Sequence, residues 1–197
     1  MFALSTIAVW DVALLAKIAT LHSESATLFF LALTYLGEWY VVALLIVVCT
    51  VVFVLYRQWF LILPFWFATL GSAAATMLLK HLIDRARPIG ALIAETGGSM
   101  PSGHATIAVA LYGFVAWYLW RSERKYGTKA DVPLLIVLIF LIAFSRLYLG
   151  VHYPTDVLAG MFVGGVFLFL SVSIVKILFK DDAPRESSFK HEKKIKQ

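Results

Sequence analysis

The chain has 197 residues, of which 61% are hydrophobic and only 15% charged, and its mean hydropathy is +0.85. Soluble domains carry about 25% charged residues, so this composition excludes a soluble protein and predicts an integral membrane protein. The formal net charge is +5, and the single cysteine, Cys49, lies in an apolar run and gives no information about the redox compartment. A membrane-spanning helix takes roughly 20 residues, so the length allows one domain of five or six spans.

The first 38 residues leave two interpretations open. Residues 2–21 are apolar enough to touch lipid, but Asp11 and Lys17 interrupt them. The segment lacks the early positive charge and the small-residue cleavage site of a signal peptide. We expect a membrane-surface helix, with a first span as the alternative. A shorter apolar piece, residues 26–36, precedes the first clear span, so residues 1–38 are predicted to form N-terminal membrane-surface or first-span helices.

From residue 39 onward, long apolar runs alternate with short polar segments. Runs of this length and composition predict membrane-spanning helices. Five runs fit the description: 40–56, 59–79, 105–120, 132–149 and 157–175. The expected fold is an all-α polytopic membrane helix bundle of five to six transmembrane helices. Its transmembrane core covers residues 39–179, and residues 180–197 form a basic cytoplasmic tail.

The basic residues are concentrated in two segments on one side of the predicted bundle. Four lie between residues 121 and 131 and seven lie after residue 175, so these two segments hold 11 of the 17. By the positive-inside rule their face is cytoplasmic, and the polar stretches at 80–104 and 146–156 then lie at the outer face. We expect the tail to contact anionic lipid headgroups, and we expect no nucleic-acid partner.

Three basic residues meet at the predicted outer face: Lys80, Arg87 and Arg146. Any one of them alone could be a side chain that reaches from a helix end toward water. Arginine, however, pairs bidentately with phosphate oxygens, and lysine adds a point charge. Charged residues at membrane depth usually mark function, so the three together favour a phosphate-binding pocket.

The segment Pro-Ser-Gly-His at residues 101–104 predicts the start of a helix. Ser102 can cap this helix, the free N–H groups of the first turn can bind an anion, and Gly103 allows a close approach. A plain capped helix start is the alternative. His104 in the first turn favours a functional site, because histidine transfers protons near neutral pH.

His152 and Asp156 are four residues apart, at the start of the last apolar run. In one interpretation Asp156 only caps the last helix and His152 lies at the membrane interface. In the other, the carboxylate accepts a hydrogen bond from one ring nitrogen and makes the second nitrogen a better nucleophile. His152 would then attack phosphorus.

These three stretches together resemble the type-2 phosphatidic acid phosphatase superfamily, which includes bacterial lipid phosphatases and the vanadium haloperoxidases. All of its motif positions are filled: Lys80–x6–Arg87–Pro88, Pro101–Ser102–Gly103–His104, and Ser145–Arg146–x5–His152–x3–Asp156. The layout resembles small bacterial members that act on undecaprenyl pyrophosphate or phosphatidylglycerol phosphate. The chain departs from many relatives at its N-terminus, where a clean first span is not evident.

The resemblance implies a role for each matching residue. His152 attacks phosphorus, Asp156 orients His152, and His104 protonates the leaving lipid oxygen. The phosphoryl oxygens are held by the remaining motif residues, Lys80, Arg87, Pro88, Ser102, Gly103 and Arg146. No carboxylates have metal-ligand spacing in these loops, so we expect neither a metal nor another cofactor.

The resemblance also implies an activity and a location. The chain would be an integral-membrane lipid phosphatase of the bacterial plasma (inner) membrane, with its active site facing the periplasm or the exterior. Its substrate would be a lipid phosphate or pyrophosphate, with undecaprenyl pyrophosphate, phosphatidylglycerol phosphate and phosphatidic acid as candidates. The alternatives are a membrane transporter, whose charges should lie nearer mid-bilayer, and a catalytically idle protein that binds lipid phosphates.

Gly160, Gly164 and Gly165 form a small-residue pattern in the last apolar run, and such patterns let helices approach closely. We expect another span of the same chain to pack against them, with a dimer face as the alternative. The pattern does not determine the oligomeric state.

Overall fold

The computed structural model describes residues 2–121 and 131–178, and all regular structure in them is helical. The N-terminal half contains α1 (Phe2–Ala19), α2 (Glu24–Thr34), η1 (Tyr35–Gly37), α3 (Trp39–Leu55), η2 (Trp59–Leu61), α4 (Ile62–Trp66), η3 (Phe67–Gly71) and α5 (Ser72–Ile83). The C-terminal half contains α6 (Gly103–Ile107), η4 (Ala108–Tyr112), α7 (Gly113–Arg121), α8 (Asp131–Tyr148) and α9 (Pro154–Leu178). The predicted basic tail, residues 180–197, lies outside the described residues.

Each of the five predicted apolar runs is helical over nearly its whole length, because a chain inside a membrane must satisfy its backbone hydrogen bonds internally. By length and hydropathy, three of the described helices can cross a membrane: Trp59–Ile83, Asp131–Tyr148 and Pro154–Leu178. A fourth span results if Glu24–Gly37 and Trp39–Leu55, which meet at a bend of 50°, count as one broken helix. The all-α membrane bundle is confirmed, and the number of five to six spans stays a prediction.

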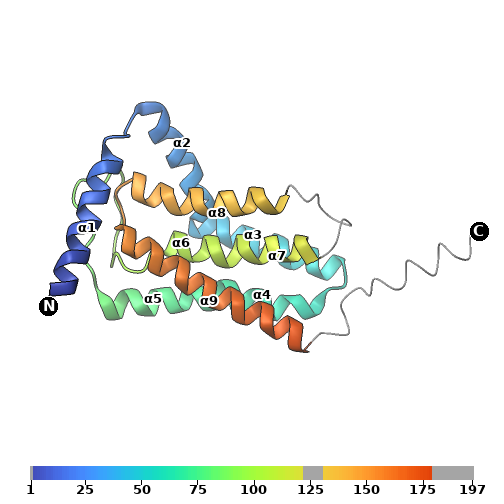
Figure 1. The fold of residues 1–197 in the computed structure, drawn as a ribbon. Helices are drawn as coiled ribbons and strands as arrows, with labels where there is room; N and C mark the ends of the chain where they lie inside the picture. The colour runs from blue at the N-terminus through green and yellow to red at the C-terminus, as the bar shows by residue number, and fades with distance from the viewer. Residues whose placement is uncertain (1, 122–130, 179–197) are drawn as a thin grey trace, which may run out of the picture.

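Figure 1 shows the long helices α5, α8, α9 and the α6–α7 pair lying side by side, with α1 across one end of the bundle. Helix α1 packs against α8 and α9 at that end. Asp11 helps to hold α1 there, since its side chain is 2% exposed and accepts a hydrogen bond from the start of α9, and Ile18 adds an apolar contact. The membrane-surface position of α1, with a first span as the alternative, stays a prediction.

Aromatic side chains pack the middle of the bundle. The rings of Phe53, Phe65 and Phe114 lie with centroids 5.3 to 6.4 Å apart, and Tyr118 packs against Phe53 at 5.3 Å. Phe65 and Phe114 are completely buried. Tilted and edge-on ring pairs of this kind stabilise by about 0.5–1.5 kcal/mol beyond the area that they bury. The cluster therefore joins α3, α4 and α7 into one rigid body.

Two glycines of α9 let α6 approach closely. A Cβ atom at Gly160 would overlap the carbonyl oxygen of Ser102, and one at Gly164 would overlap that of Thr106. The predicted contact with another span of the same chain is confirmed at these two positions. A Cβ atom at Gly165 would meet nothing within 4 Å, so this glycine takes no part in the contact.

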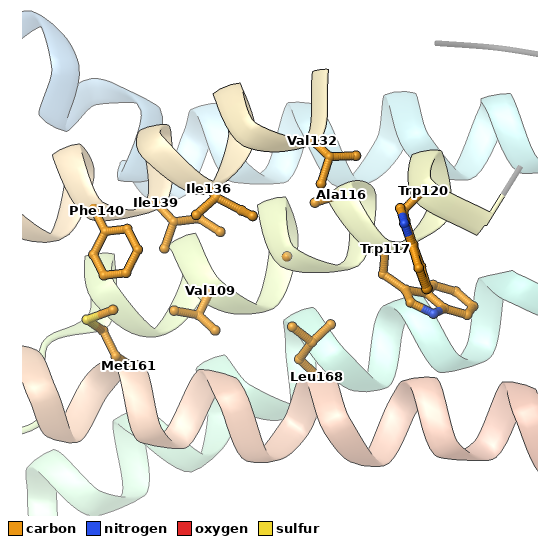
Figure 2. Close-up of a pocket in the computed structure, with 11 residues that line it drawn as sticks. Val109, Ala116, Trp117, Trp120, Val132, Ile136, Ile139, Phe140, Met161 and Leu168 are labelled. Carbon is orange, nitrogen blue, oxygen red and sulfur yellow. The ribbon is translucent and has the colours of Figure 1, made fainter. Parts of the chain in front are cut away.

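An apolar cavity of about 450 Å³ lies between α7, α8 and α9 (Figure 2). It is lined by Val109, Gly113, Ala116, Trp117, Trp120, Val132, Ile136, Ile139, Phe140, Met161 and Leu168. An apolar lining gives a phosphate group no hydrogen-bond donors, and burying a charge there would be costly. The cavity holds none of the predicted site residues, which lie at the end of the bundle.

The glycine contact predicts the effect of a single methyl group. We expect Gly164→Ala to lower the stability by about 1–3 kcal/mol, since the obstacle is backbone that cannot move aside. Gly165→Ala is the matched control, and it should leave stability unchanged or raise it by about 0.4–1 kcal/mol. Thermal unfolding of the detergent-purified variants measures both. Equal melting temperatures for the two variants would contradict the packing described here.

Candidate active site

Four helix ends bring the predicted motif residues to one end of the bundle. Lys80 lies in the last turn of α5 and His104 in the first turn of α6. Arg146 lies in the last turn of α8 and Asp156 in the first turn of α9. Helix α6 packs against α5, α8 and α9, so these ends are neighbours. Residues more than seventy positions apart in the sequence thus share one site.

His152 and Asp156 form a buried pair at the centre of this site. Their side chains are 2% and 0% exposed, and Nδ1 of His152 lies 3.7 Å from Oδ2 of Asp156. This distance exceeds that of a hydrogen bond, but it leaves the carboxylate as the group facing Nδ1. The other ring nitrogen, Nε2, lies 3.3 Å from Nη1 of Arg87. The imidazole therefore points its Nδ1 edge at an anion and its Nε2 edge at a cation.

The environment of His152 favours the neutral ring. Burial lowers the pKa of His152 below its ordinary value, because desolvation penalises the charged imidazolium, while Asp156 acts in the opposite direction. Nearby Arg146, Arg87 and Lys80 lower the pKa further. A neutral imidazole has a free lone pair, which a nucleophile needs.

Hydrogen bonds hold the carboxylate of Asp156 in place on both oxygens. Oδ1 accepts from Nη1 of Arg85 at 2.6 Å. Oδ2 accepts from the hydroxyl of Ser99 and from the backbone N–H of Tyr153, the latter at 2.8 Å. An anion with these fixed neighbours cannot rotate freely, so its position relative to His152 is set by the surrounding chain.

Backbone carbonyl groups hold two of the three predicted cations, Arg87 and Lys80. Arg87 donates to the carbonyl oxygens of Gly97, Val151 and Thr96, each at 3.0 Å. Lys80 donates to the carbonyl oxygen of Gly98 at 2.5 Å. These bonds tie both side chains to the loop between α5 and α6, and Arg87 also to the connection between α8 and α9.

Arg146 is the most buried of the cations, with an exposed fraction of 0%. Its Nη1 donates to the hydroxyl of Thr34 at 2.6 Å, and its Nη2 donates to the carboxylate of Glu95. The second oxygen of Glu95 lies 3.5 Å from Nη2 of Arg87. Glu95 thus lies between two guanidinium groups that the sequence assigns to a phosphate.

His104 lies close to Arg146, His152 and Lys80, whose charges act on its ring. Its Nε2 is 3.3 Å from Oε1 of Glu38, the residue that precedes α3. The backbone at Gly37 passes beside the ring, and a Cβ atom there would come within 2.5 Å of it. Burial and these charges lower the pKa of His104, and Glu38 is the carboxylate that faces its Nε2.

The remaining predicted residues, Ser102, Gly103 and Pro88, lie at the start of α6 and in the loop before it. Ser102 caps α6 by accepting from the N–H of Ala105 at 3.5 Å, and its own N–H donates to the carbonyl oxygen of Asp156 at 2.9 Å. Gly103 begins α6, as predicted. Pro88 follows Arg87 in the loop and is half-buried. The predicted helix start is confirmed, and the phosphate-binding roles of these three residues stay predictions.

Several residues of the site do not stand out in the sequence. In the sequence, Asp11 is noticeable as an interruption of an apolar run, and Glu95 as a carboxylate that lacks metal-ligand spacing. Arg85, Ser99 and Glu38 match no motif. A charged residue inside an apolar segment is the one available signal for Asp11. In the described part of the chain no group of three or more His, Cys, Asp or Glu side chains could hold a metal ion.

A helical membrane bundle with these three motifs at one end is typical of a membrane-bound phosphatase. Comparison with known proteins identifies the family. The model of the PAP2 superfamily matches residues 61–180, which is more than half of the chain. The chain belongs to the PAP2 superfamily, as its motifs predicted.

Curated relatives and a solved structure agree with this assignment. Phosphatidylglycerophosphatase B of Bacillus subtilis is 36% identical over 96 residues, which are 47% of this chain and 47% of that protein. Decaprenylphosphoryl-5-phosphoribose phosphatase of Mycobacterium tuberculosis is also 36% identical over 96 residues, 46% of this chain and 48% of that protein. The chain thus spans about half the length of the curated relatives that it matches.

A solved structure covers more of the chain than these relatives do. The crystal structure of a transmembrane PAP2 type phosphatidylglycerolphosphate phosphatase from Bacillus subtilis superimposes with a TM-score of 0.76 and 27% identity, over 92% of this chain and 89% of that one. Together with the apolar helices, this likeness makes the protein an integral membrane protein.

The place of Glu95 between the two arginines predicts competition with bound anions. We expect Glu95→Gln to tighten the binding of inorganic phosphate about tenfold, a factor that corresponds to ~1.4 kcal/mol. The neutral amide removes a like charge but can still accept from Arg146. Glu24→Gln removes a charge from an exposed residue of α2 and is the matched control. Calorimetric titration of the purified protein measures both, and weaker phosphate binding by Glu95→Gln would contradict the competition.

Proposed function

We propose that this protein is a lipid phosphatase that hydrolyses the terminal phosphate of a lipid phosphate or pyrophosphate through a phosphohistidine on His152. One observation carries the proposal. His152 is buried with Nδ1 facing the carboxylate of Asp156 at 3.7 Å and Nε2 facing the guanidinium of Arg87 at 3.3 Å. That orientation aims a nucleophilic lone pair at the place where cations would hold a phosphoryl group.

The first step transfers the phosphoryl group to the enzyme. The Nε2 lone pair of His152 forms a bond to phosphorus as the bond from phosphorus to the lipid oxygen breaks. The ring becomes positively charged, and the carboxylate of Asp156 stabilises that charge through Nδ1–H. Lys80, Arg87 and Arg146 neutralise the charge that spreads over the phosphoryl oxygens, and this electrostatic stabilisation is the largest contribution to the rate.

His104 supplies the proton that the leaving oxygen needs. Burial and the nearby cations lower the pKa of His104, so its ring takes up a proton with the negatively charged substrate, next to the carboxylate of Glu38 at 3.3 Å from Nε2. After transfer His104 is neutral, and in the second step it accepts a proton from the water that attacks the phosphohistidine. The bond from phosphorus to Nε2 then breaks, which releases inorganic phosphate and restores His152. The three basic side chains carry the counter-charge, so this scheme needs no metal or other cofactor.

The substrate must displace Glu95 from the arginines before it can react. A phosphate monoester carries more charge than a carboxylate and offers three oxygens to the guanidinium groups, so the exchange is favourable. The helices α5, α6, α8 and α9 each have one end at the site, which supports a location where a lipid headgroup meets water. The distribution of basic residues in the sequence supports the outer face of a bacterial plasma membrane.

Phosphate release from purified lipids tests the proposed function. We expect the detergent-purified protein to release inorganic phosphate from at least one of undecaprenyl pyrophosphate, phosphatidylglycerol phosphate and phosphatidic acid, and to do so in excess chelator. His152→Ala should be inactive on all three. Absence of release from every lipid would leave an idle binding protein or a transporter as the function. Activity that vanished with chelator and returned with magnesium would contradict the metal-free scheme.

The leaving group separates the two histidines. Loss of a general acid costs typically about 10²–10⁴-fold in rate, and the cost shrinks when the leaving oxygen needs no proton. We therefore expect His104→Ala to be far less impaired on nitrophenyl phosphate than on a lipid phosphate, and His152→Ala to be inactive on both. Initial rates on the two substrates give the comparison. An equal loss of rate in His104→Ala on both substrates would remove His104 from the role of acid.

A further inference from the structure

Asp11 is a buried carboxylate on the helix that lies across the end of the bundle. Its exposed fraction is 2%, and both of its oxygens are occupied. Oδ1 accepts from the backbone N–H of Thr155 at 3.0 Å, and Oδ2 accepts from the hydroxyl of Thr155 at 2.5 Å. Burying a charged group is costly, and a charged residue in a membrane protein usually marks a functional site. None of the three motifs includes it.

Arg85 connects this carboxylate to the proposed catalytic pair. Its Nη2 donates to Oδ2 of Asp11 at 2.7 Å, and its Nη1 donates to Oδ1 of Asp156 at 2.6 Å and to the hydroxyl of Thr155 at 2.7 Å. The ring of Tyr153 covers the guanidinium at 4.3 Å from its centroid. Arg85 therefore uses both ends of its planar fork on two carboxylates, a geometry that lysine cannot reproduce.

We propose that Asp11 and Arg85 are positioning residues that fix Asp156, and through it the imidazole of His152, for the reaction. The inference rests on the proposed function, because it assigns these residues to that same site. Arg85 holds Oδ1 of Asp156, which leaves Oδ2 as the oxygen nearest to Nδ1 of His152. Asp11 in turn fixes Arg85 and the first turn of α9, so helix α1 is part of the catalytic unit.

The charges of the network support this division of labour. Arg85 alone beside Asp156 would neutralise the carboxylate that has to stabilise the imidazolium of His152. Asp11 supplies a second negative charge to the same guanidinium, so the three groups together keep one net negative charge. That charge remains available to His152 when the ring becomes positive during phosphoryl transfer. Without Asp11, the pull of Arg85 on Asp156 would be unopposed.

Steady-state kinetics of the full-length protein tests the inference. We expect Asp11→Asn and Arg85→Gln to lower kcat about 10- to 100-fold, the range for misplaced reacting groups, with KM for the lipid unchanged. Neither residue touches Lys80, Arg87 or Arg146, which is why substrate binding should survive. Arg85→Lys should recover part of the loss, since it retains the charge but not the fork. Glu24→Gln and Arg57→Gln remove the same charges from exposed positions and should match the wild type.

A second set of variants separates positioning from simple loss of fold. In the Asp156→Asn background, Asp11→Asn should cause no further fall in kcat, because the group that it positions is already changed. Thr155→Val keeps the shape and removes the hydroxyl shared by Asp11 and Arg85, so it should lower kcat severalfold even if Asp11→Asn fails to fold.

The possible outcomes distinguish the inference from the proposed function. A wild-type protein that releases phosphate from no lipid would contradict the proposed function itself. If the wild type is active, any of three results would overturn the inference alone. Asp11→Asn and Arg85→Gln could have the same kcat as Glu24→Gln, or they could raise KM while kcat is retained. Asp11→Asn could also lower kcat in the Asp156→Asn background as much as it does in the wild type. Reduced kcat at unchanged KM, absent in that background, supports it.

Discussion

The structure depends on the pairing of charges buried at one end of a membrane bundle. Arg146 and Asp156 are both completely buried, and a buried ion without a partner costs several kcal/mol. Each is matched by an opposite charge from outside the helix that carries it: Glu95 pairs with Arg146 and Arg85 with Asp156, and Asp11 in turn pairs with Arg85. These partners come from the loop between α5 and α6 and from α1. The pairing therefore dictates both where the loop folds and why α1 lies across the bundle.

The helices make this pairing possible by bringing distant residues within reach of one another. Close approach of α9 to α6 at Gly160 lets the N–H of Ser102 bond to the carbonyl oxygen of Asp156. The aromatic cluster around Phe65 and Phe114 keeps the far part of the bundle rigid. Uncharged packing thus brings the helix ends together, and the charged network at those ends fixes the reactive groups.

The sequence predicted the helices, and its motifs include residues that the structure brings to one end of the bundle, because both carry local signals. Apolar runs must be helical in a membrane, and only three residues separate His152, just before α9, from Asp156 in its first turn. It could not predict Glu95 or Asp11 as members of the site. Their partners are 51 and 74 or more residues away, and an isolated carboxylate in a loop or helix looks the same whether its partner is water or a buried arginine. The number of spans was likewise open, since a helix bent by 50° can be counted once or twice.

The central claim is that His152 attacks phosphorus through Nε2 while Asp156 holds Nδ1, and the site of phosphorylation on the ring tests it most directly. Turnover of a phosphorus-labelled lipid can be stopped with alkali, which preserves phosphohistidine, and the His152 peptide analysed by mass spectrometry and phosphorus NMR. The account predicts phosphate on Nε2 of His152. Phosphate on Nδ1, on another residue, or on no residue during steady turnover would contradict it.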